Sequence, residues 1–258
     1  FMDFQTTEVT STDIAYEKPI HNRLFCGYMN AKDLVKGDVL EIGCGVGRGV
    51  EVLLENAKTY TAIDKNKSLT DTLKAKFPDA NFLNLNIPPF EGIADNSFDT
   101  VVTFHVIEHI QNDRKFVEEI HRVLKPGGVA FISTPNKPKT LARNPWHIRE
   151  YTKETFLKLV GNLFSEVKVR GVAGNEKVQA YMDDNKKNVD KIMRFDIFNL
   201  QWILPAVLLQ KPYEYLNKRN RVKLLNAENS LASQIEVTDY FITDDMNKSW
   251  DLFTILKK

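Results

Sequence analysis

The chain has 258 residues, and its 43% hydrophobic content is enough to bury a sizeable core in one domain with additions. Its 35 basic and 34 acidic residues leave a formal net charge of +1, which argues against a broad nucleic-acid-binding surface but not against a local basic patch. Cys26 and Cys44 fall in different predicted elements, so we expect no disulfide framework. With no secretory signal in view, the predicted location is the cytoplasm.

Apolar runs alternate with helical patterns along the chain, which predicts one doubly wound α/β domain. Residues 1–36 are expected to form an N-terminal arm or lid, helical near 22–32, and residues 37–175 the core. Residues 249–258 would supply the final core strand. Strands are expected at seven places, namely 38–42, 59–63, 80–84, 99–104, 128–133, 165–170 and 250–257.

Residues 176–248 exceed this minimal pattern, because they are too long for a loop and carry helical patterning. We interpret them as an insertion that forms a cap or an interaction surface. Within it, the apolar stretch from Ile197 to Leu209 is too short to span a bilayer and is interrupted by Pro205. Burial as a cap or a homodimer surface is the favoured interpretation; contact with anionic lipid, suggested by the basic residues from Lys211 to Lys223, is a lesser alternative.

The most informative stretch is an apolar strand that begins at Val39 and runs into Gly43, Gly45 and Gly47, with Asp64 ending a second apolar run 21 residues after Gly43. Glycines allow a tight turn and close approach of the backbone to a ligand, and an acid at the next strand end can accept two ribose hydroxyls. The pattern predicts a nucleoside-binding loop. The alternative is a tight strand-to-helix turn without a ligand.

The glycine spacing decides between nucleosides. A dinucleotide fingerprint needs G-x-G-x-x-G, but Arg48 or Val50 stands where its third glycine would be. The observed pattern, acid-x-G-x-G-x-G led by Glu41, resembles the first motif of the class I S-adenosylmethionine-dependent methyltransferases. Further stretches continue the resemblance over roughly residues 20–170: NSFDTVV from Asn96, HVIEHI from His105, RVLKPGG from Arg122 and STPN from Ser133.

This resemblance implies a Rossmann-like, mostly parallel seven-stranded sheet with an antiparallel last strand. It also implies S-adenosyl-L-methionine as cofactor and S-adenosyl-L-homocysteine as product. Asp64 would bind the ribose, although a helix N-cap is its alternative role, and Glu41 would orient the loop and its bound water. Asn86 stands where the family often has an acid for the adenine amino group. The cofactor-binding residues expected are Arg23, Glu41, Gly43, Cys44, Gly45, Gly47, Asp64, Lys65, Asn86, Ile87 and His105.

Two histidines are candidate general bases. His105 stands just past the fourth strand, where ligands bind in open parallel sheets, and an imidazole has an unperturbed pKa near neutrality. Packing over the cofactor is the alternative for His105. His147 follows the fifth strand, where the family commonly builds its acceptor pocket, and Trp146 and Tyr151 could line that pocket. The lead-in around His21 and Arg23 resembles bacterial methyltransferases of glycan and lipid-linked pathways; the Arg23 guanidinium would suit the cofactor's carboxylate.

A metal site is a weaker interpretation. His105, Glu108 and His109 stand at i, i+3 and i+4, which on a helix would place three ligands on one face. The stretch resembles the metal-binding E-x-x-E-H-x-x-H of small-RNA 2′-O-methyltransferases, but His105 and Asn112 replace two of its four ligands. We therefore expect no metal.

Taken together, the sequence predicts methyl transfer from S-adenosylmethionine to a small or medium-sized acceptor, with a hydroxyl oxygen favoured. No nucleic-acid partner is expected. Two alternatives remain open, an NAD-dependent oxidoreductase and a non-catalytic cofactor-binding partner subunit.

Overall fold

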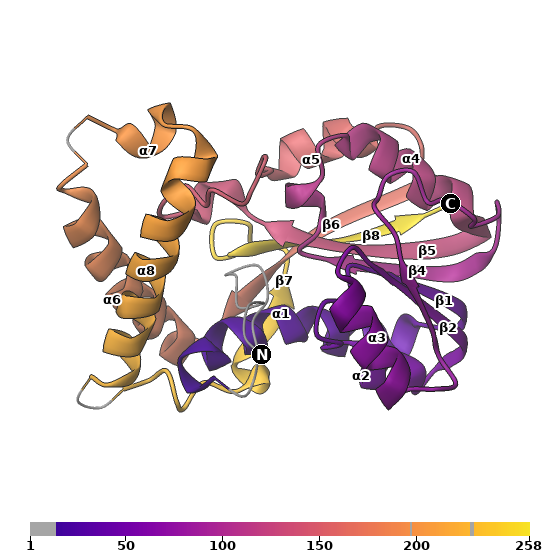
Figure 1. Cartoon of the computed structure of the whole chain (residues 1–258), viewed down its shortest axis with the longest axis horizontal. Helices are drawn as coiled ribbons and strands as arrows, with labels where there is room; N and C mark the ends of the chain where they lie inside the picture. Colours follow the sequence, from indigo (N-terminus) through magenta and orange to yellow (C-terminus); the bar gives the residue numbers. More distant parts are fainter. Residues whose placement is uncertain (1–13, 197, 228–229) are drawn as a thin grey trace.

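The computed structural model describes residues 14–196, 198–227 and 230–258. Its centre is a sheet with strand order β3-β2-β1-β4-β5-β8-β6-β7, and helices cover both faces: α4 and α5 lie above the sheet in Figure 1, and α1, α2 and α3 lie below it. The strands are β1 (Gly37–Ile42), β2 (Ala57–Asp64), β3 (Asn81–Asn84), β4 (Phe98–Phe104), β5 (Leu124–Pro135), β6 (Glu166–Gly174), β7 (Tyr240–Thr243) and β8 (Asp251–Lys257). The helices are α1 (Lys18–Ala31), α2 (Val50–Leu54), α3 (Lys67–Lys76), α4 (Asp113–Val123), α5 (Lys153–Val160), α6 (Glu176–Met193), α7 (Leu200–Ile203) and α8 (Ala206–Leu225).

The predicted Rossmann-like class is confirmed. Strands β1 to β5 pair in parallel, and β8 runs antiparallel to both β5 and β6. The predicted number of strands is wrong, because the described residues form eight. The additional strand, β7, pairs antiparallel with β6 at the sheet edge and has one buried residue in four, which explains why it lacks a clear sequence pattern.

The strand order reverses between β1 and β4, and this reversal positions the site. β2 and β3 lie on one side of β1, while β4 and β5 lie on the other. In an open parallel sheet such a reversal opens a crevice beyond the carboxyl ends of the strands. Gly43 follows β1 and His105 follows β4, so both stand at the rim of this crevice.

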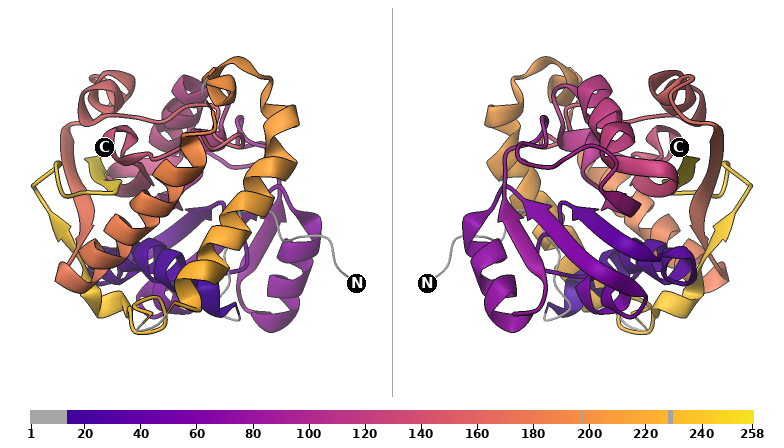
Figure 2. Two further views of the ribbon diagram at one scale, coloured as in Figure 1. Left: turned by 90° about the vertical axis from the view of Figure 1, so that its left-hand side faces the viewer. Right: turned by 90° about the vertical axis from the view of Figure 1, so that its right-hand side faces the viewer.

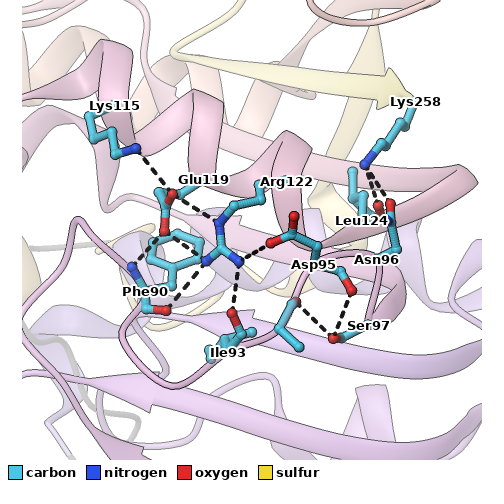
Figure 3. A network of polar contacts seen from close by, with 11 residues as sticks. Phe90, Ile93, Asp95, Asn96, Ser97, Lys115, Glu119, Arg122, Leu124 and Lys258 are labelled. Carbon is cyan, nitrogen blue, oxygen red and sulfur yellow. Dashed lines mark hydrogen bonds and ion pairs between the residues drawn. The ribbon is translucent and has the colours of Figure 1, made fainter.

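Helix α4 is held on the sheet by both apolar and polar contacts. Asn112 caps its start by accepting a hydrogen bond from the Lys115 amide. Phe116 and Ile120, on the side of α4 that faces the core, are fully buried. Arg122, near its end, binds both carboxylate oxygens of Glu119, at 3.0 and 2.9 Å, and also Asp95 and the Ile93 carbonyl (Figure 3). This network ties α4 to the loop that leads into β4.

The segment between β6 and β8 contains α6, α7, α8 and β7, and its three helices stand to the left of the sheet in Figure 1. Figure 2 shows α6 and α8 together on that side of the molecule, and the Asn220 amide joins them by donating to Asn185 at 2.7 Å. The N-terminal helix α1 is tied to the same segment, because Asn22 donates to the Ile235 carbonyl at 2.9 Å. Of the apolar stretch predicted here, Ile197 lies outside the described residues. Among the helices described, none has the length and apolarity needed to cross a bilayer.

Candidate functional site

The glycine loop leaves open space at the crevice. Gly43 and Gly45 have φ angles of 76° and 52°, in the left-handed region that favours glycine. A Cβ on Gly43 would lie 2.2 Å from the Val106 side chain, so a larger residue cannot fit there. A Cβ on Gly45 would meet no atom within 4 Å. Gly43 is therefore required by packing, whereas Gly45 presents bare backbone to the crevice, where a ligand can approach.

Asp64 closes β2 beside this loop. Its Oδ2 accepts a hydrogen bond from the Gly45 amide and its Oδ1 accepts one from the Asn66 amide, each at 2.8 Å. The alternative that Asp64 caps the next helix is wrong, because the cap of α3 is Asn66, whose side chain accepts from the Leu69 amide. The carboxylate is half-buried and fixed in orientation at the crevice.

Glu41 lies beneath the loop rather than in the crevice. It is fully buried, and its carboxylate accepts a hydrogen bond from Tyr28 at 2.7 Å and another from Tyr60. Burial raises the pKa of Glu41 against the opposing effect of these two hydroxyls. A tyrosine thus anchors each oxygen of Glu41, and its predicted role in orienting the loop and its bound water stays a prediction. Burial also raises the pKa of the Cys44 thiol, so this loop cysteine is a neutral neighbour of the ligand space.

The remaining predicted cofactor residues differ in exposure. Lys65 and Asn86 are exposed, and Ile87 is half-buried. Arg23 lies on α1, and its Nε is 3.0 Å from an oxygen of Asp251. The Arg23 guanidinium, which was predicted to bind the carboxylate of the cofactor, thus pairs through Nε with a carboxylate of the protein itself.

His105 does not lie on a helix. It has a φ of 58°, in a turn after β4, and only the single 3-10 turn Ile107–His109 follows. Its Nδ1 lies 3.3 Å from Glu108 and its Nε2 lies 3.6 Å from Asp251 and 3.3 Å from the Ser133 hydroxyl. His105, Glu108 and His109 therefore do not share one helical face.

The charges around His105 change its protonation. Burial alone would lower the pKa of His105, but Asp251 and Glu108 together raise it to about 9. Conversely, although burial opposes it, the His105 imidazolium holds the pKa of Glu108 at about 2. His105 is thus an imidazolium at neutral pH. The argument for His105 as a general base assumed an unperturbed pKa, and this environment does not favour it.

His147 has a different setting. Its Nδ1 lies 2.6 Å from Glu150, and its Nε2 lies 2.8 Å from the Asn144 amide nitrogen. Since the Trp146 amide donates to the other Asn144 side-chain atom, Oδ1, the Asn144 nitrogen is the one that donates to His147. This assigns a neutral imidazole with its proton on Nδ1, directed at Glu150, and its lone pair on Nε2.

The structure also brings His147 to Glu108 and His109, with the ligand atoms of all three within 4.8 Å of one another. The rings of His109 and His147 pack edge to face at 5.0 Å, and the Nδ1 of His109 lies 2.9 Å from the Trp146 carbonyl. The residues whose possible ligand atoms lie close together are thus Glu108, His109 and His147, and the last of these comes from the loop after β5.

These side chains line one cavity of about 250 Å³ between the core and the segment 176–248. One wall is formed by α1, β8 and the loops after β4 and β5, with Arg23, Asp251, His105, Glu108, His109 and His147. The other wall is formed by α6 and α8, with Met182, Asn185, Tyr213, Asn217 and Arg221. Trp146 and Tyr151, expected in the pocket, are not among its described lining residues, and the Tyr151 hydroxyl instead donates to Asp113 at 2.8 Å.

Sequence reasoning missed several of these residues. Asp251 had a recognisable signal, because it is a lone acid opening an otherwise apolar strand. Tyr213 and Arg221 carried no signal, since the helix that bears them reaches the cavity only through the tertiary fold.

The comparisons with known proteins bear on the loop and strands just described. The family described as "Methyltransferase domain" matches residues 40–132, from β1 to β5. Residues 40–132 thus form a methyltransferase domain, similar to that of proteins named S-adenosylmethionine-dependent methyltransferases. The cofactor of the family is S-adenosylmethionine, which favours it over NAD as the ligand of the glycine loop.

Curated relatives of this chain include a probable S-adenosylmethionine-dependent methyltransferase of Mycolicibacterium smegmatis, 34% identical over 135 residues, which are 50% of this chain and 52% of the relative. A ubiquinone biosynthesis O-methyltransferase of Rickettsia typhi is 35% identical over 115 residues, 43% of this chain and 46% of the relative. The chain thus spans about half the length of the curated relatives it matches.

Solved structures share the fold of this chain. A crystal structure of an S-adenosylmethionine-dependent methyltransferase from Archaeoglobus fulgidus has a TM-score of 0.54 and 17% identity, covering 93% of both chains. The [4+2]-cyclase SpnF has a TM-score of 0.56 and 15% identity, covering 92% of this chain and 81% of that one. At such identities the likeness concerns the fold alone.

Proposed function

We propose that the protein transfers the methyl group of S-adenosylmethionine to a hydroxyl oxygen of a small or medium-sized acceptor bound in the cavity. The observation that carries this proposal is the His147 imidazole, held by Glu150 through Nδ1 in the cavity wall. The similarity to ubiquinone biosynthesis O-methyltransferases supports oxygen as the target atom.

The cofactor residues follow from the crevice. Gly43 and Gly45 form the turn, Gly45 leaves room for the ligand, and Asp64 offers carboxylate lone pairs to the ribose hydroxyls. S-adenosylmethionine supplies an activated methyl group on a sulfonium. The protein's part is to hold the acceptor oxygen in line with the methyl carbon and the sulfur, and to exclude water.

Bound S-adenosylmethionine would supply the methyl group to the acceptor oxygen, and its sulfur would keep the electron pair of the carbon–sulfur bond. The hydroxyl proton passes to His147 Nε2, and the negative charge of Glu150 stabilises the imidazolium that forms. The acceptor hydroxyl would replace the Asn144 amide as the partner of Nε2, since that amide occupies the lone pair at 2.8 Å. Glu150 itself is held by a hydrogen bond from Thr140.

His105 has a positioning role in this proposal. As an imidazolium between Glu108 and Asp251, it balances two buried carboxylates and fixes the turn after β4 beside the transferred group. It does not need to accept a proton.

Cofactor binding is tested first by titration calorimetry with S-adenosylmethionine, S-adenosylhomocysteine and NAD. We expect the first two to bind and NAD not to bind. Asp64→Ala should weaken binding about 10-fold or more, because a charged hydrogen-bonding partner of the ribose is lost. Asp71→Ala, which changes an exposed acid on the following helix, is the control and should leave binding unchanged. Binding of NAD alone would overturn the proposal.

Catalysis is tested with a panel of phenolic, sugar and alcohol acceptors, following formation of S-adenosylhomocysteine. His147→Ala should lower kcat by about 10²- to 10⁴-fold with the Kd of S-adenosylmethionine unchanged. Glu150→Gln should lower it by a smaller factor. A protein that binds the cofactor tightly but turns over none of these acceptors would favour the non-catalytic partner subunit.

A further inference from the structure

The outer side of the segment 176–248 exposes an unusual concentration of apolar side chains. Of the thirteen large hydrophobic residues exposed in the described part of the chain, eight lie between positions 195 and 215. Seven of them surround α7 and the start of α8 and are here called the apolar tip: Phe195, Phe198, Leu200, Trp202, Ile203, Val207 and Leu208. Trp202, Ile203 and Val207 are 61%, 70% and 70% exposed, which is far more than a cap folded onto its own domain would leave.

The tip stands at one end of the segment. Figure 1 shows α7 at the upper left, at the end of the α6 and α8 pair that lies away from α1. The Arg143 side chain holds the tip in place by donating hydrogen bonds to the Gln201 carbonyl at 2.7 Å and to the Leu204 carbonyl at 3.0 Å. The apolar side chains are therefore presented by an anchored turn of chain.

Basic residues continue from the tip along the exposed side of α8. The exposed positions recur at helical spacing, and the basic ones are here called the basic face: Lys211, Lys218, Arg219 and Lys223. The one acid of α8, Glu214, is half-buried. None of Lys211, Lys218 and Arg219 forms an ion pair with a described residue.

A shallow cavity of about 240 Å³ between α6 and α8 adds to this face. Lys191, Arg219 and Lys223 line it, and the described lining includes no acidic residue. Exposed lysines and an arginine around a small hollow form a site that suits the phosphate of a lipid headgroup.

We propose that the apolar tip and the basic face dock the protein on an anionic lipid bilayer, with the tip entering the headgroup region and the bases binding lipid phosphates. A helix with apolar and aromatic residues at one end, whose exposed charged residues are all basic, has the features of an interfacial membrane element. Aliphatic residues such as Ile203 and Val207 have no use in stacking on nucleic-acid bases. A two-fold dimer through this surface would bring two copies of the basic face into one interface, and these like charges repel.

Docking would place α8 between the bilayer and the cavity, because α8 uses its opposite side, through Tyr213, Asn217 and Arg221, to line that cavity. The docking itself does not depend on methyl transfer, so its test reads binding alone.

The test is flotation of the full chain with phosphatidylcholine vesicles that contain 0 or about 30% phosphatidylglycerol, at low and high salt. The anionic vesicles should carry the protein upward, and high salt should weaken this. Lys211→Glu with Lys218→Glu should weaken binding about 10-fold or more. Lys74→Glu with Lys158→Glu makes the same charge change at exposed sites outside this surface and should have little effect.

Trp202→Ser with Ile203→Ser should also release the protein from anionic vesicles without unfolding it, as circular dichroism would verify. Equal loss in the Lys74 and Lys158 control, or no binding to anionic vesicles, would overturn the proposal. Two further results would overturn it in a protein that does not bind vesicles. One is a dimer that the tip variant abolishes, and the other is binding of a single-stranded oligonucleotide that the basic-face variant abolishes.

Discussion

His105 Nε2 lies 3.6 Å from Asp251 Oδ2, and this contact joins the turn after β4 to the first residue of β8. Asp251 is fully buried and also pairs with Arg23. Three chain segments that are distant in sequence thus meet around one carboxylate, at the floor of the cavity.

Asp251→Asn should lower the pKa of His105 and leave Arg23 without its buried partner. We expect a loss of about 3 kcal/mol in the free energy of unfolding, because breaking a buried ion pair leaves an uncompensated charge. Urea unfolding would measure the loss, and NMR titration the pKa. The control is Asp244→Asn, which removes an exposed partner of Arg170 and should cost under about 1 kcal/mol. An unchanged His105 titration would show that Asp251 does not set its charge.

The stability of the protein should fall at alkaline pH. The pKa of His105 is about 9 in the folded protein against an ordinary pKa of 6.5, so its contribution to stability is complete below about pH 6.5 and is lost as the pH rises through 9. Urea unfolding between pH 6 and 10 should show this decline, and His105→Gln should flatten it. Acid acts through Glu108 with the opposite sign: its contribution is complete above about pH 4.5 and is lost as the pH falls through 2.

Two glycine variants should separate folding from cofactor binding. Gly43→Ala would drive a Cβ to 2.2 Å from Val106 and should destabilise the protein by more than 2 kcal/mol, roughly the sum of strain and overpacking. The Cβ of Gly45→Ala would meet no atom within 4 Å, so this variant should lose only about 1 kcal/mol of stability, because of its positive φ. Its added methyl group occupies ligand space, so the Kd of S-adenosylmethionine should rise. If Gly45→Ala binds the cofactor as wild type does, the ligand does not approach this part of the loop.

Arg122→Ala should reduce stability without affecting the cofactor. It removes a bidentate partner of Glu119 and the link to Asp95 shown in Figure 3, and we expect a cost of about 2 to 3 kcal/mol. Arg114→Ala, which breaks an exposed pair with Glu118 on the same helix, should cost no more than about 0.5 kcal/mol. Thermal unfolding measures both, and calorimetry should find the same Kd for S-adenosylmethionine in each. A weakened Kd in Arg122→Ala would mean that the network supports the crevice.

Local sequence patterns were sufficient to predict the strands of the central sheet. β1 and β4 are apolar runs bounded by turn residues, and Gly43, Gly45 and Asp64 stand at strand ends, where the parallel arrangement itself defines the crevice. The edge strand β7 could not be predicted, because a short strand with one buried residue has no periodicity to detect. The division into arm, core, insertion and last strand stays a prediction.

The sequence by itself determined the alternation of strands and helices, the loop spacing that matches S-adenosylmethionine rather than NAD, and two candidate bases. Only the tertiary structure decided how those histidines differ. It surrounds His105 with Glu108 and Asp251 and gives His147 the partners Glu150 and Asn144. A side chain's protonation depends on charges within a few ångströms, and those charges come from segments whose proximity no local pattern encodes.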